Sequence, residues 1–587
     1  MILQRVIQYS DLYPEEAENL PDVRAFLGGL RRKDLCTITA NMVQRIVGKP
    51  FFDNNLDPRE EEYDGVRFFL SSRDPAFVQD VINRYTVARR RAQSSGFQGS
   101  FIATSKAAVM SFQRLFFSMI PEKSKDFSVQ IEKGYFKGLL LVNESVYKIG
   151  YDESTHSTEP SDLRLAHLYL AYNYANEDVE TGDLSDLFRR QLTKSLTLFT
   201  FLFRSKDKRV KILRRRFMAH YHIGSWSEFI IPHIMTLHYL NQESGLLVIL
   251  GRDKTGRAAR RVIREICIDK EAIIPIKDNS DYLVFRGKPY IRMKKHHYAI
   301  TNQAFVIEHL FNSVYFELKA FRKDARFMSD DEFRQFYTTE FSQKYMFEGY
   351  VNQCLPTSVL TSRSGSECDA LLDEARTRGI NVDGIVPPDY FIKTPDGCVV
   401  IEYKDALTSA KVKESRNPER LFAEIREKFF ENGRGRHKGI SQLLDSAKAI
   451  QDGSFFFDDC PTDSVIYPVL VVDNLAYTMR GMHTILEYLM RDECQRRGMR
   501  SDTIRPLILM DVATLKLYSD YLSQNGLIRV FEDYYQHIDG SSASVATDPF
   551  ETLISFSEYM KDKEIKNMGK IYDRLIREAR PVLRSYN

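Results

Sequence analysis

Several features that would identify a protein class are missing or scarce in this sequence. Its seven cysteines contain no CxxC pair, which excludes a zinc ribbon and gives no disulfide framework, so we expect a protein of the reducing cytoplasm. Tryptophan occurs once, and 83 Lys and Arg residues nearly balance 80 Asp and Glu residues, for a formal net charge of +3. The net charge neither requires nor excludes a nucleic-acid partner, because phosphate binding depends on local clusters of cations.

Long apolar runs are also missing. The most apolar stretch, residues 195–203, is much shorter than the ~20 residues that cross a bilayer, and the first residues lack the pattern of a secretory signal. We therefore expect no membrane partner. A Walker A motif is absent as well, because residues 251–257 lack its Gly-Lys-Ser/Thr ending. Any ATP-driven step would require a separate activating or ATPase subunit.

What the sequence does contain is a change of pattern along its 587 residues, too many for one hydrophobic core. We predict a mixed α/β N-terminal domain over 1–150 and a mainly helical domain over 151–339. An α/β domain follows over 340–540, and a helical tail over 541–587. Within 340–540 short strands alternate with helices, which is typical of a layered α/β fold.

The individual elements are predicted from hydrophobic periodicity and turn residues. Before the α/β domain, residues 298–318 form one long amphipathic pattern that predicts a single helix. In and around the α/β domain we predict helices over 331–355, 366–378, 439–450 and 481–497, and strands over 465–473 and 504–510.

The segment with the most chemical information is a predicted β-hairpin. Asp389 precedes an apolar run, the turn sequence Thr-Pro-Asp-Gly follows at 394–397, and a second apolar run leads to Glu402 and Lys404. With the two central turn residues at the tip, Asp389 lies across from Glu402, and the period of two places Lys404 on the same face. A bulge at the turn glycine would instead shift the register by one and turn Asp389 away.

Two carboxylates and an ammonium group at one sheet edge suit phosphodiester hydrolysis. Carboxylate oxygens are ligands for Mg²⁺ or Mn²⁺, and the bound metal lowers the pKa of a water molecule and neutralises charge on the phosphate. A lysine beside the metal can orient the attacking water and stabilise the reacting oxygens.

Pro388-Asp389 and Glu402-Tyr403-Lys404 resemble the PD and (D/E)xK elements of the PD-(D/E)XK nuclease superfamily. The resemblance covers about 340–515 and implies a restriction-endonuclease-like mixed sheet core, α-β-β-β-α-β, preceded here by a mixed and mainly helical N-terminal region. It implies Mg²⁺ (or Mn²⁺) held by Asp389, Glu402 and the Tyr403 carbonyl.

The same resemblance suggests further catalytic residues outside the hairpin. Glu348, on the helix before the strands, matches the acid that this helix often adds, with Glu367 and Glu374 as rivals. Gln442, on the helix after the hairpin, matches a polar residue that some branches place near the metal. The tyrosine that the exonuclease-like branch has four positions later is Ser446 here, so the chain departs from that branch.

Clustered cations offer candidate nucleic-acid contacts. The Gly-rich loop at 432–439 carries Arg434, Arg436 and Lys438 just before a predicted helix, where backbone amides and cations suit phosphate oxygens; the alternative is a solvated loop. Basic runs at 89–91, 214–216 and 294–297 are interpreted as solvated faces. His220, His222, His233 and His238 have no zinc-site spacing, so we expect them to be core or surface histidines.

These observations together predict a metal-dependent DNA endonuclease of the restriction or phage-defence kind, for which a homodimer would suit double-strand cleavage. Two alternatives stay open. The chain could be a catalytically silent nuclease-fold subunit that binds DNA or supports assembly, or a regulatory protein in which the motif is accidental. The bare ExK pattern is weak, because it recurs at 317–319 and 564–566 on segments predicted to be helical.

Overall fold

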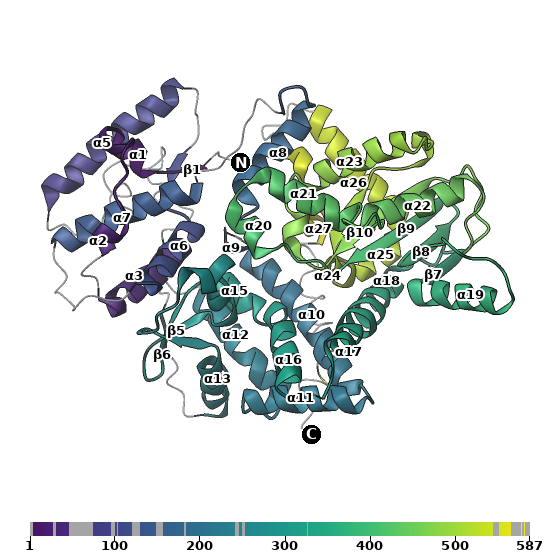
Figure 1. Cartoon of the computed structure of the whole chain (residues 1–587), viewed down its shortest axis with the longest axis horizontal. Coiled ribbons are helices and arrows are strands. Elements are labelled where there is room, and N and C mark those ends of the chain that lie inside the picture. The colour runs from purple at the N-terminus through teal and green to yellow at the C-terminus, as the bar shows by residue number, and fades with distance from the viewer. Residues whose placement is uncertain are drawn as a thin grey trace.

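The computed structural model describes most of the chain and is shown in Figure 1. The described residues are 4–27, 31–45, 74–95, 100–102, 104–119, 129–147, 156–180, 183–240, 246–248, 253–325, 327–543, 551–564, 577 and 580. Most of the predicted tail beyond residue 564 therefore lies outside the described residues. The predicted division into four domains stays a prediction.

The centre of the C-terminal half is a five-stranded mixed sheet with the order β11-β10-β9-β8-β7. β8 (Tyr390–Thr394) and β9 (Gly397–Lys404) form an antiparallel hairpin, and β7 (Thr361–Ser364) pairs antiparallel with β8. On the other side of the hairpin, β10 (Ile466–Val472) pairs parallel with β9, and β11 (Ile508–Asp511) pairs parallel with β10. The prediction of a mixed α/β architecture is confirmed at this level.

The register of the hairpin is the one predicted without a bulge. Tyr390 pairs with Ile401 and Thr394 with Gly397, without a shift between them. Gly397 is required at the turn for two reasons. Its φ of +149° lies in a region that side chains disfavour, and a Cβ there would lie 2.5 Å from the Val465 carbonyl oxygen. The turn residues therefore fix which side chains of the two strands share a face.

Both faces of the sheet are covered, as expected for a sheet with parallel strands. All seven residues of β10 are buried, which explains its continuous apolar sequence. Residues such as Phe391, Val400 and Leu470 pack on one face against α8, α21, α22 and α23. Residues such as Ile392, Ile401 and Val469, on the other face, share a core with residues of η4, α18, α25 and α26.

The helices around the sheet have the following bounds: α17 (Asp330–Arg334), η4 (Gln335–Glu348), α18 (Gly349–Cys354), α19 (Gly365–Thr377), α20 (Ala410–Ser415), α21 (Pro418–Phe429), α22 (Gly439–Gln451), η5 (Leu475–Thr478), α23 (Met482–Arg496), η6 (Ser501–Thr503), α24 (Val512–Leu517), α25 (Ser519–Asn525), α26 (Leu527–Ala543), η7 (Glu551–Leu553) and α27 (Phe556–Glu564). The predicted helices at 366–378, 439–450 and 481–497 are confirmed within a few residues. The helix predicted over 331–355 is also present, but its middle part, η4, is a π-helix.

The N-terminal half is mainly helical and begins with elements at the left of Figure 1. These are β1 (Gln4–Val6), α1 (Tyr9–Leu12), η1 (Pro14–Glu16), α2 (Arg24–Leu27), α3 (Arg32–Arg45), α5 (Pro75–Ser94), β2 (Ser100–Ile102), α6 (Lys106–Phe117) and α7 (Val129–Tyr147). β1 and β2 pair in parallel. Apolar side chains of α1, α3, α5, α6 and α7 share one core with residues of β4, β5, β6, α14 and α15.

The elements that follow connect this region to the large sheet. They are α8 (Ser161–Asn173), α9 (Glu177–Glu180), α10 (Leu184–Arg204), α11 (Lys208–His220), α12 (Trp226–Leu240), β3 (Leu246–Val248), α13 (Lys254–Glu265), β4 (Cys267–Asp269), η3 (Ile276–Tyr282), α14 (Leu283–Gly287), β5 (Tyr290–Lys294), β6 (His297–Ile300), α15 (Gln303–Glu308) and α16 (Asn312–Ala325). β3, β6, β5 and β4 form a second sheet in that order. One apolar core extends from α10 through α12 and α16 to the large sheet and α27.

The prediction of a single helix over 298–318 is wrong. Residues Tyr298 to Ile300 belong to β6, which pairs antiparallel with β5. Asn302 then caps α15, because its side chain accepts a hydrogen bond from the Ala304 amide, and α16 begins only at Asn312. The strand pairing and the cap override an amphipathic pattern that runs through all three elements.

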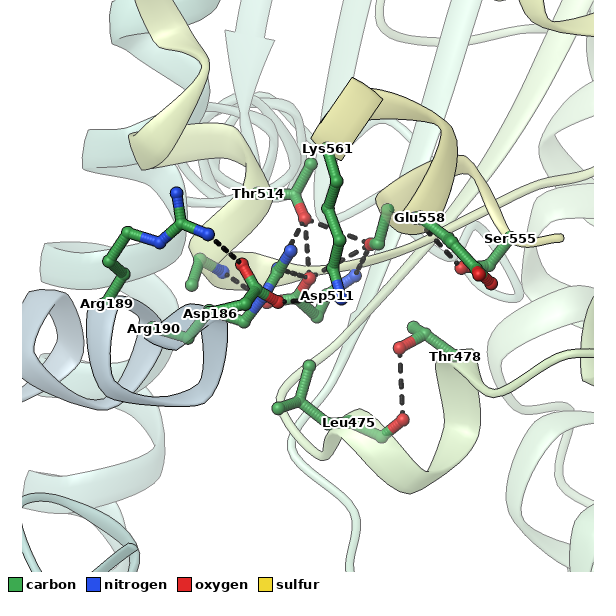
Figure 2. Close-up of polar contacts among 12 residues, drawn as sticks. Asp186, Arg189, Arg190, Leu475, Thr478, Asp511, Thr514, Ser555, Glu558 and Lys561 are labelled. Carbon is green, nitrogen blue, oxygen red and sulfur yellow. Dashed lines mark hydrogen bonds and ion pairs between the residues drawn. The ribbon is translucent and has the colours of Figure 1, made fainter. Parts of the chain in front are cut away.

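A buried ion-pair network joins α10 to the end of β11 (Figure 2). The guanidinium of Arg190 is 2.7 Å from Asp186 and also binds Asp511 and Thr514, while Lys561 of α27 lies 3.0 Å from Asp186. Arg190 is 1% exposed. Because burying these charges is costly unless each is paired, the network fixes how α10 and α27 lie against the sheet.

Two expectations from composition can be compared with the structure. All seven cysteines are described, and all are free. Among the described helices, none combines the length and the apolar character that crossing a membrane requires. The cytoplasmic location stays a prediction.

Candidate active site

The hairpin brings Asp389, Glu402 and Lys404 together at the sheet edge. Asp389 directly precedes β8, and the other two lie near the end of β9 on the face that α22 covers. Lys404 Nζ is 2.8 Å from Glu402 Oε2 and 3.7 Å from Asp389 Oδ2. The predicted convergence of the three side chains is therefore present.

Both carboxylate oxygens of Asp389 are held in place. Oδ2 accepts a hydrogen bond of 2.8 Å from the Tyr403 amide, and Oδ1 accepts one of 2.8 Å from Gln343 Nε2. The first partner lies on the neighbouring strand and the second on η4. Each oxygen keeps a second lone pair, so Asp389 is oriented while remaining able to bind a cation.

Glu402 is the most unusual group of the three. It is 1% exposed, and its Oε1 has no hydrogen-bond partner among the described residues. Burial raises the pKa of Glu402 to about 8, and the charge of Asp389 and a hydrogen bond with Asp389 add to this effect, although Lys404 acts in the opposite direction. An unpartnered buried carboxylate oxygen is costly, and a bound cation would supply the missing partner.

Lys404 stays protonated in this environment. Burial lowers the pKa of Lys404, but Glu402 and Asp389 outweigh this effect and raise the pKa to about 12. The donor set of two carboxylates beside one ammonium group therefore fits a hard divalent cation such as Mg²⁺ or Mn²⁺.

Tyr403, whose carbonyl was predicted as a ligand, points its side chain to the opposite face of the sheet. Its hydroxyl is 2.7 Å from Ser342 Oγ, and its ring stacks on Phe347 with centroids 4.8 Å apart. Its amide donates to Asp389. Tyr403 thus connects η4 with the carboxylates through both its side chain and its backbone, and the role of its carbonyl stays a prediction.

Glu348 lies near the three residues but contacts a different partner. Its Oε1 accepts hydrogen bonds from the amide and hydroxyl of Ser366 at 3.2 and 2.9 Å. The adjacent Gly365 amide donates to the Asp389 carbonyl at 2.8 Å. Among the described contacts, none joins Glu348 to Glu402 or Lys404. Glu348 therefore fixes the start of α19 beside Asp389, and burial raises its pKa.

The two rivals of Glu348 also have local partners. Glu367 forms a capping box with Ser364 at the start of α19. Glu374 is paired with Arg378 on the exposed side of the same helix. Neither is brought to the three residues by a described contact.

Gln442 is placed on α22 without a described contact to the three residues. Its Oε1 accepts a hydrogen bond of 2.9 Å from the Gly439 amide, so it closes the first turn of its own helix. The loop before this helix carries Arg434 and Arg436 on the surface and Lys438 half-buried. In the described part of the chain none of these three side chains has an ion-pair partner, which leaves their charges available to a phosphate.

Sequence reasoning missed Gln343 and Ser342, which reach the hairpin from η4. Their contacts cross more than 45 positions of sequence, and the π-helical backbone changes which residues of the segment share a face. The only signal in the sequence was their position shortly before Glu348 on the predicted helix.

Comparisons of the chain with known protein families, curated proteins and solved structures find no match.

Proposed function

We propose that the chain is a metal-dependent nuclease that hydrolyses phosphodiester bonds in DNA. The observation that carries this proposal is the buried Glu402, which has an unpartnered oxygen and lies beside Asp389 and Lys404. A second observation supports it. η4 and α18, β7, the hairpin, α22 and β10 follow the order α-β-β-β-α-β of restriction-endonuclease-like nucleases, with α19 and the pair α20 and α21 as insertions.

Each residue has a role that its position supports. Asp389 and Glu402 would hold Mg²⁺, which when bound supplies a water of lowered pKa and neutralises charge on the phosphate. Lys404 Nζ would donate hydrogen bonds to the attacking water and to the phosphate oxygens as their charge grows. Gln343 and the Tyr403 amide keep the Asp389 carboxylate in one orientation, and the 432–439 loop would contact the DNA backbone.

A silent nuclease-fold subunit is the second candidate. It would bind DNA through the same loop but would lack turnover. The convergence of Glu402, Asp389 and Lys404 favours the enzyme, because two carboxylates beside an ammonium group are the groups that metal-dependent phosphodiester hydrolysis uses.

The direct test is cleavage of supercoiled and linear DNA with Mg²⁺ or Mn²⁺, with EDTA as the metal-free reference. Wild type should cut, and Lys404→Ala should cut at least ~100-fold more slowly. Lys448→Ala is the matched control, because this lysine is half exposed and paired with Asp452 on α22; it should cut like wild type. Equal cutting by Lys404→Ala and wild type would refute the assignment.

If wild type does not cut, Mn²⁺ binding separates the remaining explanations. Binding that is lost in Asp389→Asn would support a nuclease site that is silent or awaits an activator. A wild-type protein that binds no Mn²⁺ would refute both candidates and leave the motif accidental.

A further inference from the structure

A group of potential metal ligands lies outside the hairpin, where α8 begins. His156 Nδ1 is 3.1 Å from Glu159 Oε1, and His167 Nδ1 is 2.8 Å from Glu159 Oε2. One ligand atom from each residue can be chosen such that all lie within 4.8 Å of one another. The sequence pattern is His-x₂-Glu-x₇-His, which is not one of the usual spacings of structural zinc ligands.

Local structure explains why residues at this unusual spacing meet. The Glu159 amide donates to the His156 carbonyl, which closes a turn and brings the two side chains to the same side. Pro160 then starts α8 with φ of −53°, and His167 lies on its second turn. The turn reverses the chain, so a ligand from before the helix faces one within it.

The site is partly enclosed. Exposure of the side chains is 18% for His156, 24% for Glu159 and 10% for His167. The His167 ring packs between His156 and Phe422 of α21, with ring centroids 4.4 and 4.7 Å away. The carboxylate side is the most open, so an ion could enter there and keep a water molecule as an additional ligand.

One cation could bridge the three side chains. His156 Nδ1 and His167 Nδ1 both lie close to the Glu159 carboxylate, at 3.1 and 2.8 Å. Imidazole nitrogens and a carboxylate oxygen each offer a lone pair. A divalent ion placed between the three side chains would therefore find three ligand atoms.

We propose that His156, Glu159 and His167 form a Zn²⁺ site that is separate from the proposed nuclease centre. Zn–N and Zn–O bonds of about 2.0–2.2 Å in a tetrahedron imply ligand atoms about 3.3 Å apart. The two histidines approach different oxygens of Glu159, and one ligand atom from each residue lies within 4.8 Å of the other two. Binding therefore requires the three side chains to move together by up to about 1.5 Å. Two imidazoles and one carboxylate select Zn²⁺ over Mg²⁺ or Ca²⁺, which prefer oxygen ligands.

The position of the site indicates what the ion does. α8 packs against α21 and α23 and contributes Leu163, Ala166 and Leu170 to the core on the α22 face of the sheet. Zn²⁺ would fix the turn at 156–160 to α8 beside Phe422. Because α21 leads into the basic loop, the ion stabilises the packing that positions this loop.

The test is metal binding by the full-length chain after removal of metals with a chelator. Asp389→Asn is used as the background, so that Zn²⁺ cannot bind the hairpin carboxylates. Zn²⁺ titrated by calorimetry should bind at one ion per chain, and Co²⁺ should give the intense visible bands of tetrahedral coordination. Zn²⁺ should also raise the melting temperature by a few degrees, and Mg²⁺ should not compete.

Variants assign the ligands. His156→Ala and Glu159→Gln should each weaken Zn²⁺ binding at least ~10-fold and abolish the Co²⁺ bands. His222→Asn is the matched control, because this exposed histidine has a φ of 52° that Asn tolerates; it should bind like the background. His167→Gln is a further variant. Because His167 is more buried than His156, its replacement could also disturb packing, so His156→Ala is the decisive variant.

Two results would overturn the proposal. One is a folded protein that binds no Zn²⁺ at micromolar concentrations. The other is Zn²⁺ binding that is equal in His156→Ala, Glu159→Gln and the background, which would place the ion elsewhere, for example on the free cysteines. Because nuclease activity is not a readout, failure of the nuclease proposal leaves this test intact.

Discussion

Gln343 Nε2 donates a 2.8 Å hydrogen bond to Asp389 Oδ1, so the π-helix η4 directly orients one carboxylate of the proposed nuclease centre. The other oxygen of Asp389 accepts from the Tyr403 amide. A ligand held on both oxygens loses little further freedom when a cation binds. η4 therefore contributes to the site through a neutral side chain that carries no catalytic charge.

Replacing Gln343 with Leu should weaken Mn²⁺ binding roughly 10–100-fold, because such supporting hydrogen bonds set ligand orientation. Cleavage at subsaturating metal should fall by a similar factor and should recover in part at high Mn²⁺. Gln335→Leu is the control, since this glutamine is exposed on the same helix and should leave metal affinity unchanged. Gln343→Leu with wild-type Mn²⁺ affinity would show that η4 has no positioning role.

Glu402→Gln should abolish cleavage while changing the free energy of unfolding by less than about 1 kcal/mol. With a pKa of about 8, the Glu402 carboxyl is mainly protonated at neutral pH without metal, and the amide has nearly the same shape. Urea unfolding and DNA cutting measure the two effects. A large loss of stability would mean that the ionised Glu402 contributes to the fold, and would contradict a carboxyl that is neutral until a metal binds.

The hairpin could be predicted from the sequence because its information is local. The turn residues at 394–397 and the alternation of apolar residues determine the register, and the register places Asp389, Glu402 and Lys404 on one face. Long apolar patterns likewise predicted α22, α23 and β10 within a few residues.

Contacts between distant segments could not be predicted in this way. Gln343 reaches Asp389 because η4 is a π-helix, in which a different set of residues faces the sheet than in an α-helix. No periodicity in the sequence of η4 indicates this change. His167 meets Glu159 only because the chain turns at Pro160. The prediction correctly put the helix that carries Glu348 near Asp389. The Glu348 side chain, however, accepts a hydrogen bond from Ser366 of α19, and the sequence does not indicate that α19 packs there.

Arg434 and Arg436 are expected to contact DNA phosphates, because they are exposed beside the start of α22. Replacing both with Ala should weaken binding of all DNA sequences equally and reduce the slope of log K against log salt by about 2, since each phosphate contact contributes ~0.9. Fluorescence anisotropy at several salt concentrations measures this. The double variant Arg376→Ala with Arg378→Ala is the control. It removes the same number of charges from α19, where each arginine forms an exposed ion pair with an acidic residue. An unchanged salt slope in the loop variant would exclude the loop from the interface.

Asp186 should make stability depend on pH in the acid range. Burial would raise its pKa, but Arg190 and Lys561 outweigh burial and lower the pKa to about 2, against an ordinary value of 3.8. A carboxyl whose folded pKa is lowered contributes stability that is complete above the unfolded value and is lost as pH falls through the folded value. The contribution of Asp186 is therefore expected to decrease between about pH 4 and pH 2.

Asp186→Asn should accordingly be less stable than wild type at about pH 5, and the difference should narrow at about pH 4 and pH 3. Urea midpoints at each pH measure it, and Asp331→Asn, at an exposed surface pair, should show no such trend. A constant difference between wild type and Asp186→Asn would mean that the side chain acts by shape and hydrogen bonding alone. A difference that narrows would show that the ionised carboxylate between Arg190 and Lys561 holds α10 and α27 against β11, because protonation removes the charge and leaves the packing in place.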